Sequence, residues 1–126
     1  MKRLLNQDVY GMARVGFIDE YEIYVNTDDG GAIPHFHYRL ENEWDKFHTC
    51  ICIETSEYFH HNNKQNILNS KQKKSLDQFM KSAVQISKYA DKFSNNWQLV
   101  CFLWDLNNSN VEISKKAKQP DYTKLI

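Results

Sequence analysis

The sequence predicts an α+β fold: a small antiparallel β-sheet of about four strands, with one long amphipathic helix on one face and a second, shorter helix beside it. Three observations lead to this prediction. Short runs that alternate apolar and polar residues fill the first half of the chain, a run with helical periodicity follows, and a short, almost wholly apolar segment comes next. The 126 residues, 41% of them hydrophobic, suffice for one folded domain and exclude a disordered chain. We therefore predict a single domain over residues 1–126, with residues 115–126 as an extended C-terminal tail.

The alternating runs predict four strands in the first half of the chain. They cover residues 12–18, 21–26, 34–40 and 46–54, and a further short strand is expected at 111–114. Asp19-Glu20 is the predicted turn between the first two strands. Thr27-Asp28-Asp29-Gly30-Gly31 is a strong turn before the third, because Asp and Gly tolerate the positive φ that hairpin turns require.

The register of the sheet follows from keeping its apolar side chains on one face. Ile23 opposite Tyr38 and Phe36 opposite Ile51 satisfy that condition. The same register pairs Glu22 with Arg39, His37 with Cys50 and His35 with Cys52 on the other face. Imidazole and thiol side chains are therefore expected to gather on the face that turns away from the long helix.

Two helices are predicted in the second half of the chain. Apolar residues at helical spacing indicate an amphipathic helix over residues 71–92, with Ser70 as its N-cap. The segment 97–106 is apolar on nearly all sides, which fits either a helix or a buried strand. We favour a helix, because Trp97 and Trp104 then share a face.

The polar face of the predicted sheet collects side chains that can bind a metal. These candidate ligands are His35, His37, Cys50 and Cys52. Imidazole combined with thiolate suits zinc, which prefers four tetrahedral ligands. The competing interpretation is an ordinary polar face whose histidines bond to neighbouring groups. We expect no resident cofactor, with zinc at these four residues as the one candidate, and we assign no catalytic residue.

The same face is also a candidate interface. A sheet with helices on one side leaves its other face uncovered, and here that face carries residues of mixed polarity. The predicted interface residues are Tyr24, His35, His37, Arg39 and His48. Burying aromatic surface behind a polar rim is typical of protein interfaces, which favours a protein partner or a homodimer.

The long helix carries a basic face. Seven Lys stand against two Asp in residues 64–92, whereas residues 1–63 hold eleven Asp and Glu against five Lys and Arg. The candidates for phosphate contacts are Lys71, Lys73, Lys74 and Lys81. Because this face lacks Arg and interleaved aromatic residues, nucleic-acid binding is expected to be weak and non-specific.

The order of these features matches a known pattern. A hairpin, the strand Pro34-His35-Phe36-His37, a second strand, a basic helix and then Asn96-Trp97 resemble the bacterial domain-of-unknown-function family numbered 4160. The resemblance covers roughly residues 15–107. Leu68-Asn69-Ser70-Lys71-Gln72-Lys73 and the ending with Asn107-Asn108 and Pro120-Asp121-Tyr122 resemble a longer variant from Bacteroidota. The resemblance implies a small cytoplasmic protein encoded near toxin–antitoxin genes, without an established activity. Cys50 and Cys52 are not part of the family pattern, so it lends the thiol ligands no support.

These observations favour a small cytoplasmic accessory or protein-interaction domain in a toxin–antitoxin or defence setting, of bacterial or phage origin. One alternative is a small metal-dependent enzyme with a histidine-based site at His35 and His37. The other is a non-specific nucleic-acid-binding module that uses the Lys-rich helix. The longest apolar run, Leu99 to Trp104, is too short to cross a bilayer, so no membrane association is expected. Three Cys, an odd number, fit a reducing cytoplasm.

Overall fold

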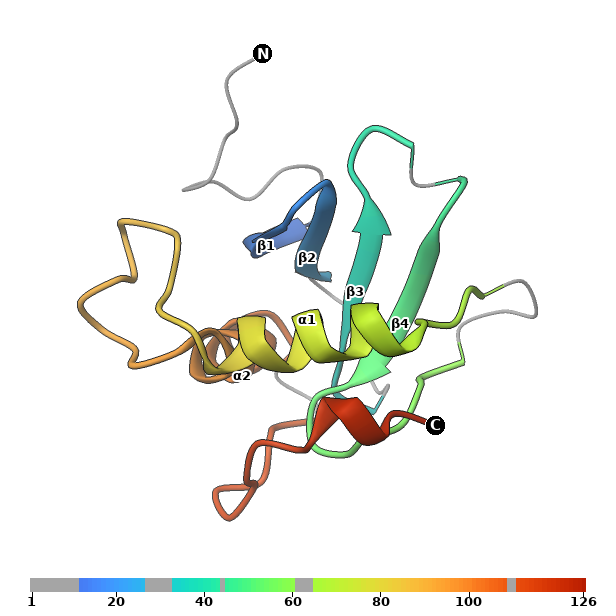
Figure 1. Cartoon of the computed structure of the whole chain (residues 1–126). Coiled ribbons are helices and arrows are strands. Elements are labelled where there is room, and N and C mark those ends of the chain that lie inside the picture. Colours follow the sequence, from blue (N-terminus) through green and yellow to red (C-terminus); the bar gives the residue numbers. More distant parts are fainter. Residues whose placement is uncertain (1–11, 27–32, 44, 61–64, 109–110) are drawn as a thin grey trace.

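Four strands form one antiparallel sheet in the order β1-β2-β3-β4. The computed structural model describes residues 12–26, 33–43, 45–60, 65–108 and 111–126. The strands are β1 (Met12–Ile18), β2 (Tyr21–Asn26), β3 (His35–Leu40) and β4 (His48–Cys52). With two helices beside the sheet, the predicted α+β class is confirmed (Figure 1). The turn at residues 19–20 is present, with Asp19 at a φ of 50°, and the turn predicted at 27–31 lies outside the described residues.

The predicted register of the sheet is confirmed. Glu22 pairs with Arg39, His37 with Cys50 and His35 with Cys52. The fourth strand is shorter than predicted and ends at Cys52 instead of residue 54. The chain turns back after it, and its return segment runs along the outer edge of β4. There the Cys52 N–H donates to the Glu57 carbonyl at 2.8 Å, and the Phe59 N–H donates to the Cys50 carbonyl at 2.9 Å.

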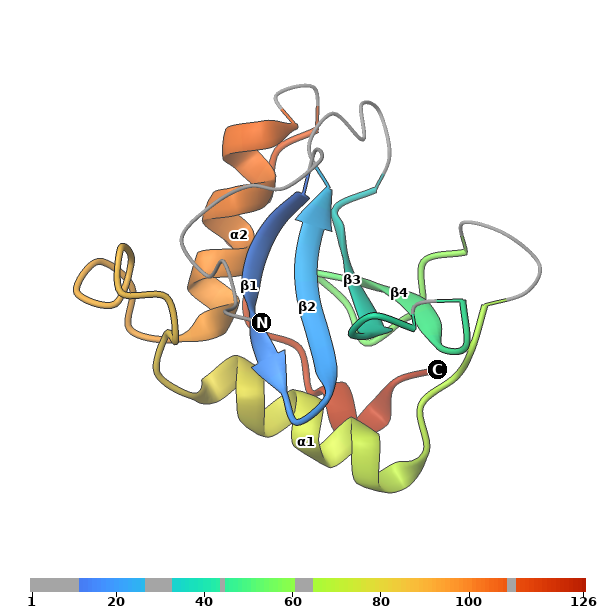
Figure 2. The same cartoon turned by 90° about the horizontal axis from the view of Figure 1, so that it is seen from above.

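Helix α1 (Ser70–Lys81) crosses the sheet beneath the β1–β2 turn, and helix α2 (Asn96–Asn107) runs beside β1 and β2 (Figures 1 and 2). The helix predicted over 97–106 is thus confirmed. The N-cap of α1 is Asn69 and not Ser70. Its side chain accepts from the Gln72 N–H, and the Gln72 side chain accepts from the Asn69 N–H, which is a complete capping box.

Helix α1 ends at Lys81, so the prediction of a helix to residue 92 is wrong. The cause is a side chain from the following helix. Asn96, which is fully buried, donates from Nδ2 to the Phe79 carbonyl at 2.8 Å and to the Ala83 carbonyl at 3.3 Å. Its own N–H donates to the Ser82 carbonyl at 3.0 Å. These bonds satisfy carbonyls that a longer helix would have used internally, and the chain continues past Ser82 in an extended conformation.

The core lies between the apolar face of the sheet and the two helices. Phe36, Ile51 and Ile53 share one cluster with Leu76 and Met80 of α1. Phe79 joins the same cluster, whereas Ala83, which the predicted helix over residues 71–92 would have included, lies beyond α1 and is exposed.

The C-terminal segment packs into this core. Residues Tyr122–Lys124 form a 3-10 helix, which corrects the prediction of an extended tail over 115–126, and the strand predicted at 111–114 is not formed. Tyr122 is fully buried, its hydroxyl donates to the Ile53 carbonyl at 3.0 Å, and its N–H donates to the Asp77 carboxylate at 3.0 Å. The edge of Tyr122 also meets the Phe36 ring at 5.8 Å between centroids. The end of the chain is therefore a structural part of the domain.

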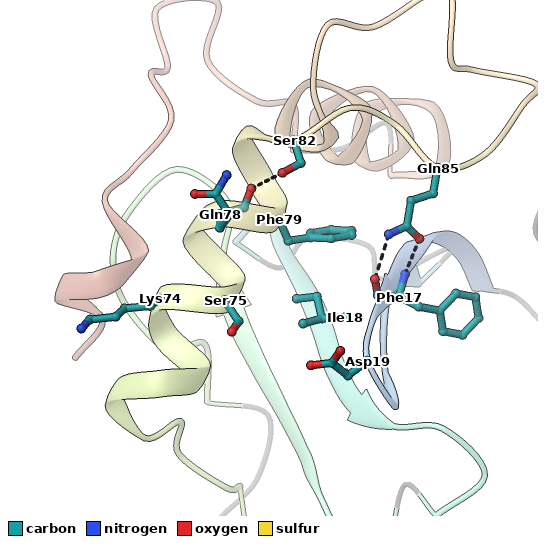
Figure 3. Close-up of a pocket in the computed structure, with 9 residues that line it drawn as sticks. All are labelled: Phe17, Ile18, Asp19, Lys74, Ser75, Gln78, Phe79, Ser82 and Gln85. Atoms are coloured by element: carbon teal, nitrogen blue, oxygen red, sulfur yellow. Dashed lines mark hydrogen bonds between the residues drawn. The ribbon is translucent and has the colours of Figure 1, made fainter.

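The outer edge of β1 is covered by a side-chain amide. The Phe17 N–H donates to Gln85 Oε1 at 2.8 Å, and Gln85 Nε2 donates to the Phe17 carbonyl at 2.9 Å (Figure 3). Gln85 thus takes the place of one residue of a neighbouring strand. Gly16 makes room for it: a Cβ at this position would lie 2.7 Å from Gln85 Oε1 and 3.1 Å from Phe79 Cε1.

Candidate metal centre

Cross-strand pairing places the side chains of the polar face next to one another. His37 lies opposite Tyr24 on one side and Cys50 on the other, and Arg39 lies opposite His48. Because paired residues project to the same face, these five side chains form one continuous surface across β2, β3 and β4. It is the face that sequence periodicity predicted for the imidazoles and thiols.

Three potential metal ligands converge there: His37, His48 and Cys50. Their ligand atoms all lie within 4.8 Å of one another. His37 Nδ1 is 2.9 Å from His48 Nε2 and 3.3 Å from Cys50 Sγ. This is the only group of three or more His, Cys, Asp or Glu ligands found among the residues that the structure describes.

Neighbouring groups hold the two imidazoles in place. The Tyr24 ring stacks on His37 with centroids 4.6 Å apart, and its hydroxyl lies 3.3 Å from His48 Nε2. The Asn26 side-chain amide lies 3.2 Å from His37 Nε2. Asn66 brackets the backbone of His48: its Oδ1 accepts from the His48 N–H at 2.9 Å, and its N–H donates to the His48 carbonyl at 3.1 Å. Both rings therefore have fixed orientations.

This face is buried within the chain. Tyr24, His37 and Cys50 are 3%, 3% and 2% exposed, and only His48 of the three candidate ligands is half-buried. The expectation that Tyr24, His35, His37, Cys50 and Cys52 lie on an uncovered face is wrong. Part of the reason is the return segment along β4, which places the Phe59 ring flat on His35 at 3.9 Å between centroids. A partner at this face would meet chiefly His48 and Arg39, and their predicted interface role stays a prediction.

His35 and Cys52 are not members of the converging group, although the sequence suggested both as ligands. The His35 imidazole is bound through Nδ1 to the Ile33 carbonyl at 2.8 Å and stacked on Phe59. Cys52 belongs to the next cross-strand row, opposite His35, and burial raises the pKa of its thiol. The metal-ligand candidates taken from the sequence did not include His48, the third member of the converging group. The signal was available, because His48 and Cys50 alternate on one strand and so share a face.

A buried ion cluster adjoins the candidate ligands. Glu22, only 1% exposed, accepts from Nε of Arg39 at 2.8 Å and also from Nε of Arg14. The Arg39 guanidinium lies over the Tyr24 ring, 4.5 Å from its centroid. Arg14 was not identified from the sequence, and its place opposite Tyr24 in the sheet is what brings it to Glu22.

The lysines proposed for nucleic-acid contact are all on α1. Lys71, Lys74 and Lys81 are exposed and Lys73 is half-buried. Lys81 is paired with Asp77 at 2.8 Å, and the hydrogen bond that its ammonium group donates to this carboxylate raises the pKa of Lys81. Helical spacing places Lys73 about 160° around the helix from Lys71, so the four lysines spread over almost half of the helix circumference.

A scan of protein-family models found no match to this chain, and neither did searches of curated proteins and of solved structures. The resemblance noted from the sequence therefore stays a prediction. Within the described residues, no helix is both long enough and apolar enough to cross a bilayer.

Proposed function

We propose that this protein binds a zinc ion through His37, His48 and Cys50. The observation that supports the proposal is their convergence: three ligand atoms from two strands within 4.8 Å of one another, two of them on buried side chains. Neutral imidazole and thiolate are preferred zinc ligands. Three protein ligands are also the number that zinc enzymes use when the fourth position is left to water or substrate.

The spacing of the ligand atoms is close to what zinc needs. Zinc–nitrogen bonds of 2.0–2.1 Å and a zinc–sulfur bond of 2.3 Å place tetrahedral ligands about 3.3 Å apart for two nitrogens and about 3.6 Å apart for nitrogen and sulfur. The distances of 2.9 Å and 3.3 Å are each a few tenths of an ångström shorter. The third pair, His48 Nε2 and Cys50 Sγ, lies within 4.8 Å, and rotations of the side chains about χ1 and χ2 would have to bring all three spacings to the values for zinc.

The Asn26 side chain can support His37 as a metal ligand. A histidine that binds metal through one ring nitrogen usually donates its other N–H to an acceptor. Asn26 lies 3.2 Å from His37 Nε2, and a half-turn of its amide presents the oxygen as that acceptor. The stacked Tyr24 ring and the bonds from Asn66 limit the movement of both imidazoles.

The reaction class that we propose for such a centre is hydrolysis of a small substrate, because zinc with three protein ligands supplies Lewis-acid chemistry. His48 is the ligand closest to solvent and would mark the route of access. The Tyr24 hydroxyl, 3.3 Å from His48 Nε2, is the neighbouring group available to orient a bound molecule.

Calorimetric titration of the metal-free protein with zinc tests the proposal. One zinc per chain is expected, with loss of binding in His48→Ala and Cys50→Ser. Cys52→Ala is the matched control, because it removes a neighbouring buried thiol outside the converging group, and it should bind zinc as the parent does. Binding should also raise the free energy of unfolding, by about 2.7 kcal/mol at a zinc concentration one hundred times Kd.

The contrary interpretation is a hydrogen-bonded network without metal, running from Asn26 through His37 to His48 and Tyr24. A protein that takes up no zinc would support the network and contradict the metal centre. Zinc that is lost equally in Cys52→Ala would contradict the assignment of His37, His48 and Cys50 as the ligands.

Protein interaction is the second candidate function, and a surface on α2 favours it. Phe102 and Leu106, one turn apart, are 38% and 61% exposed, and Phe102 packs against the rings of Tyr89 and Phe93. Light scattering of the parent and of Leu106→Glu tests self-association through this surface. A cytoplasmic location and a toxin–antitoxin setting remain predictions from the sequence.

A further inference from the structure

A cavity of about 300 Å³ lies between the β1–β2 turn and the N-terminal half of α1; its lining residue Tyr38 alternates with His37 on β3 and so projects to the sheet face opposite the polar face. Its walls include Asp19, Glu20 and Tyr21 of the turn region, and Lys71 and Ser75 of the helix. A second, more open hollow of about 510 Å³ adjoins it and shares Asp19 and Ser75 (Figure 3). Figure 3 shows the Asp19 carboxylate and the Ser75 hydroxyl on opposite sides of the gap between turn and helix.

Tyr38 lines this cavity. The residue is 1% exposed, and among the described residues no hydrogen bond reaches its hydroxyl. That oxygen is not one of the buried atoms that lack a hydrogen bond, so it is open to the cavity and can bond to solvent or to a ligand there. Burial has the largest effect on the pKa of Tyr38, and Tyr21, Asp19 and Glu20 add to it; all raise this pKa, so the hydroxyl stays protonated.

The charges around the cavity are separated by sign. Asp19 and Glu20 stand on the turn, and Lys71 stands on the helix four residues before Ser75, on the same helical face. Within the described residues, neither Asp19 nor Lys71 forms an ion pair with another side chain. The cavity therefore has an anionic wall and a cationic wall that do not neutralise each other directly.

The capping box of α1 also holds part of the cavity wall in place. Gln72, held by the capping box with Asn69, also donates from Nε2 to the Tyr21 hydroxyl at 3.2 Å. The Tyr21 ring in turn packs on Tyr38, with centroids 4.8 Å apart. The side chains of Gln72, Tyr21 and Tyr38 in the cavity wall are thus held in place before any ligand binds.

We propose that this cavity binds a small zwitterion, an α-amino acid, with its ammonium group between Asp19 and Tyr38 and its carboxylate between Lys71 and Ser75. An ammonium group donates to the carboxylate of Asp19 and to the hydroxyl oxygen of Tyr38. The carboxylate accepts from the ammonium of Lys71 and the hydroxyl of Ser75. Each contact is charge-assisted, and the two ends of the ligand match the two walls.

Calorimetric titration of the protein with each of the twenty L-α-amino acids tests this inference. At least one of these amino acids should bind. The matching amine, which lacks its carboxylate, and the matching carboxylic acid, which lacks its ammonium group, should each bind at least about tenfold more weakly. Asp19→Asn, Lys71→Gln and Tyr38→Phe should each weaken binding by about tenfold or more. Asn tolerates the positive φ of residue 19, so Asp19→Asn preserves the turn.

Lys46→Gln is the matched control, because it removes a lysine that is paired with Glu43 on another loop and should leave binding unchanged. The inference is overturned if no amino acid binds, if an amine or a carboxylic acid alone binds as well, or if the three cavity variants bind as the parent does. Zinc binding is a separate outcome, since none of the three variants touches His37, His48 or Cys50.

Discussion

At the scale of single residues, Glu22 is the buried negative charge that pairs with the arginines of the polar face. It is almost completely buried and accepts from two arginines, each only slightly exposed. A buried ion cluster of this kind adds little when intact, but loss of one member leaves the others desolvated and unpaired.

Glu22→Gln is therefore expected to lower the free energy of unfolding by about 3 kcal/mol, because two guanidinium groups lose their counter-charge. Urea denaturation measures the change. Glu43→Gln, which breaks an exposed pair with Lys46, is the control and should cost less than about 1 kcal/mol. Equal effects of the two substitutions would show that the cluster around Glu22 is solvated.

The thiol of Cys101 provides a test of protonation state. Burial of the thiol has the largest effect on the pKa of Cys101, and the negative charges of Asp105 and Glu54 add to it. Together they raise this pKa to about 12. Its thiolate is then roughly a thousandfold rarer at pH 8 than that of free cysteine, which should slow alkylation by iodoacetamide by a similar factor. The rate should rise as the pH approaches 12, or when the protein is unfolded. Mass-spectrometric timing of alkylation at Cys101 checks this, and a rate equal to that of free cysteine at pH 8 would refute it.

The sequence predicted the polar face and its register correctly, but two of its four ligand candidates, His35 and Cys52, are not in the converging group. Alternation decides which side of a sheet a residue occupies, so His37 and Cys50 were found. It does not decide which neighbours converge within a face. That choice depends on ring rotations and on Phe59, which holds His35 away from the group through a return segment that has no periodic pattern.

At the scale of elements, Gln85 and Gly16 act together at the edge of β1. Gln85→Ala should expose the backbone groups of Phe17 and lower the free energy of unfolding by about 1–2 kcal/mol. Gly16→Ala should destabilise the parent by a similar amount, because the new Cβ displaces the Gln85 amide.

In the Gln85→Ala background, Gly16→Ala should cost clearly less, since the group that it displaces is gone. Thermal unfolding of the four proteins of this double-mutant cycle gives the coupling energy. Strictly additive effects would show that the two residues act independently.

The two helices illustrate what local patterns determine. Helical periodicity predicted α1, and the short apolar segment 97–106, with Trp97 and Trp104 on one face, predicted α2. The end of α1 does not, because Asn96 of α2 caps it from fourteen residues beyond Ser82. A long-range cap leaves no signal in the helix that it ends.

At the scale of the whole molecule, the C-terminal segment completes the core. Tyr122→Ala should lower the free energy of unfolding by about 3–5 kcal/mol, because it removes a fully buried ring between Phe36 and α1. Tyr122→Phe, which removes only the bond to the Ile53 carbonyl, should cost about 1 kcal/mol. Denaturant titration of both variants checks the gradation, and a Tyr122→Ala protein as stable as the parent would contradict the packing. The sequence suggested a tail here, since one aromatic residue in a polar stretch carries no periodic signal.

The zinc centre is the central functional claim, and X-ray absorption at the zinc edge of the zinc-loaded protein tests it most directly. We predict one zinc per chain, with two nitrogen ligands at about 2.0–2.1 Å, one sulfur ligand at about 2.3 Å and one further light atom. The sulfur contribution should vanish in Cys50→Ser and persist in Cys52→Ala. A spectrum without sulfur, or sulfur that vanishes in Cys52→Ala, would contradict the assignment of His37, His48 and Cys50 as the ligands.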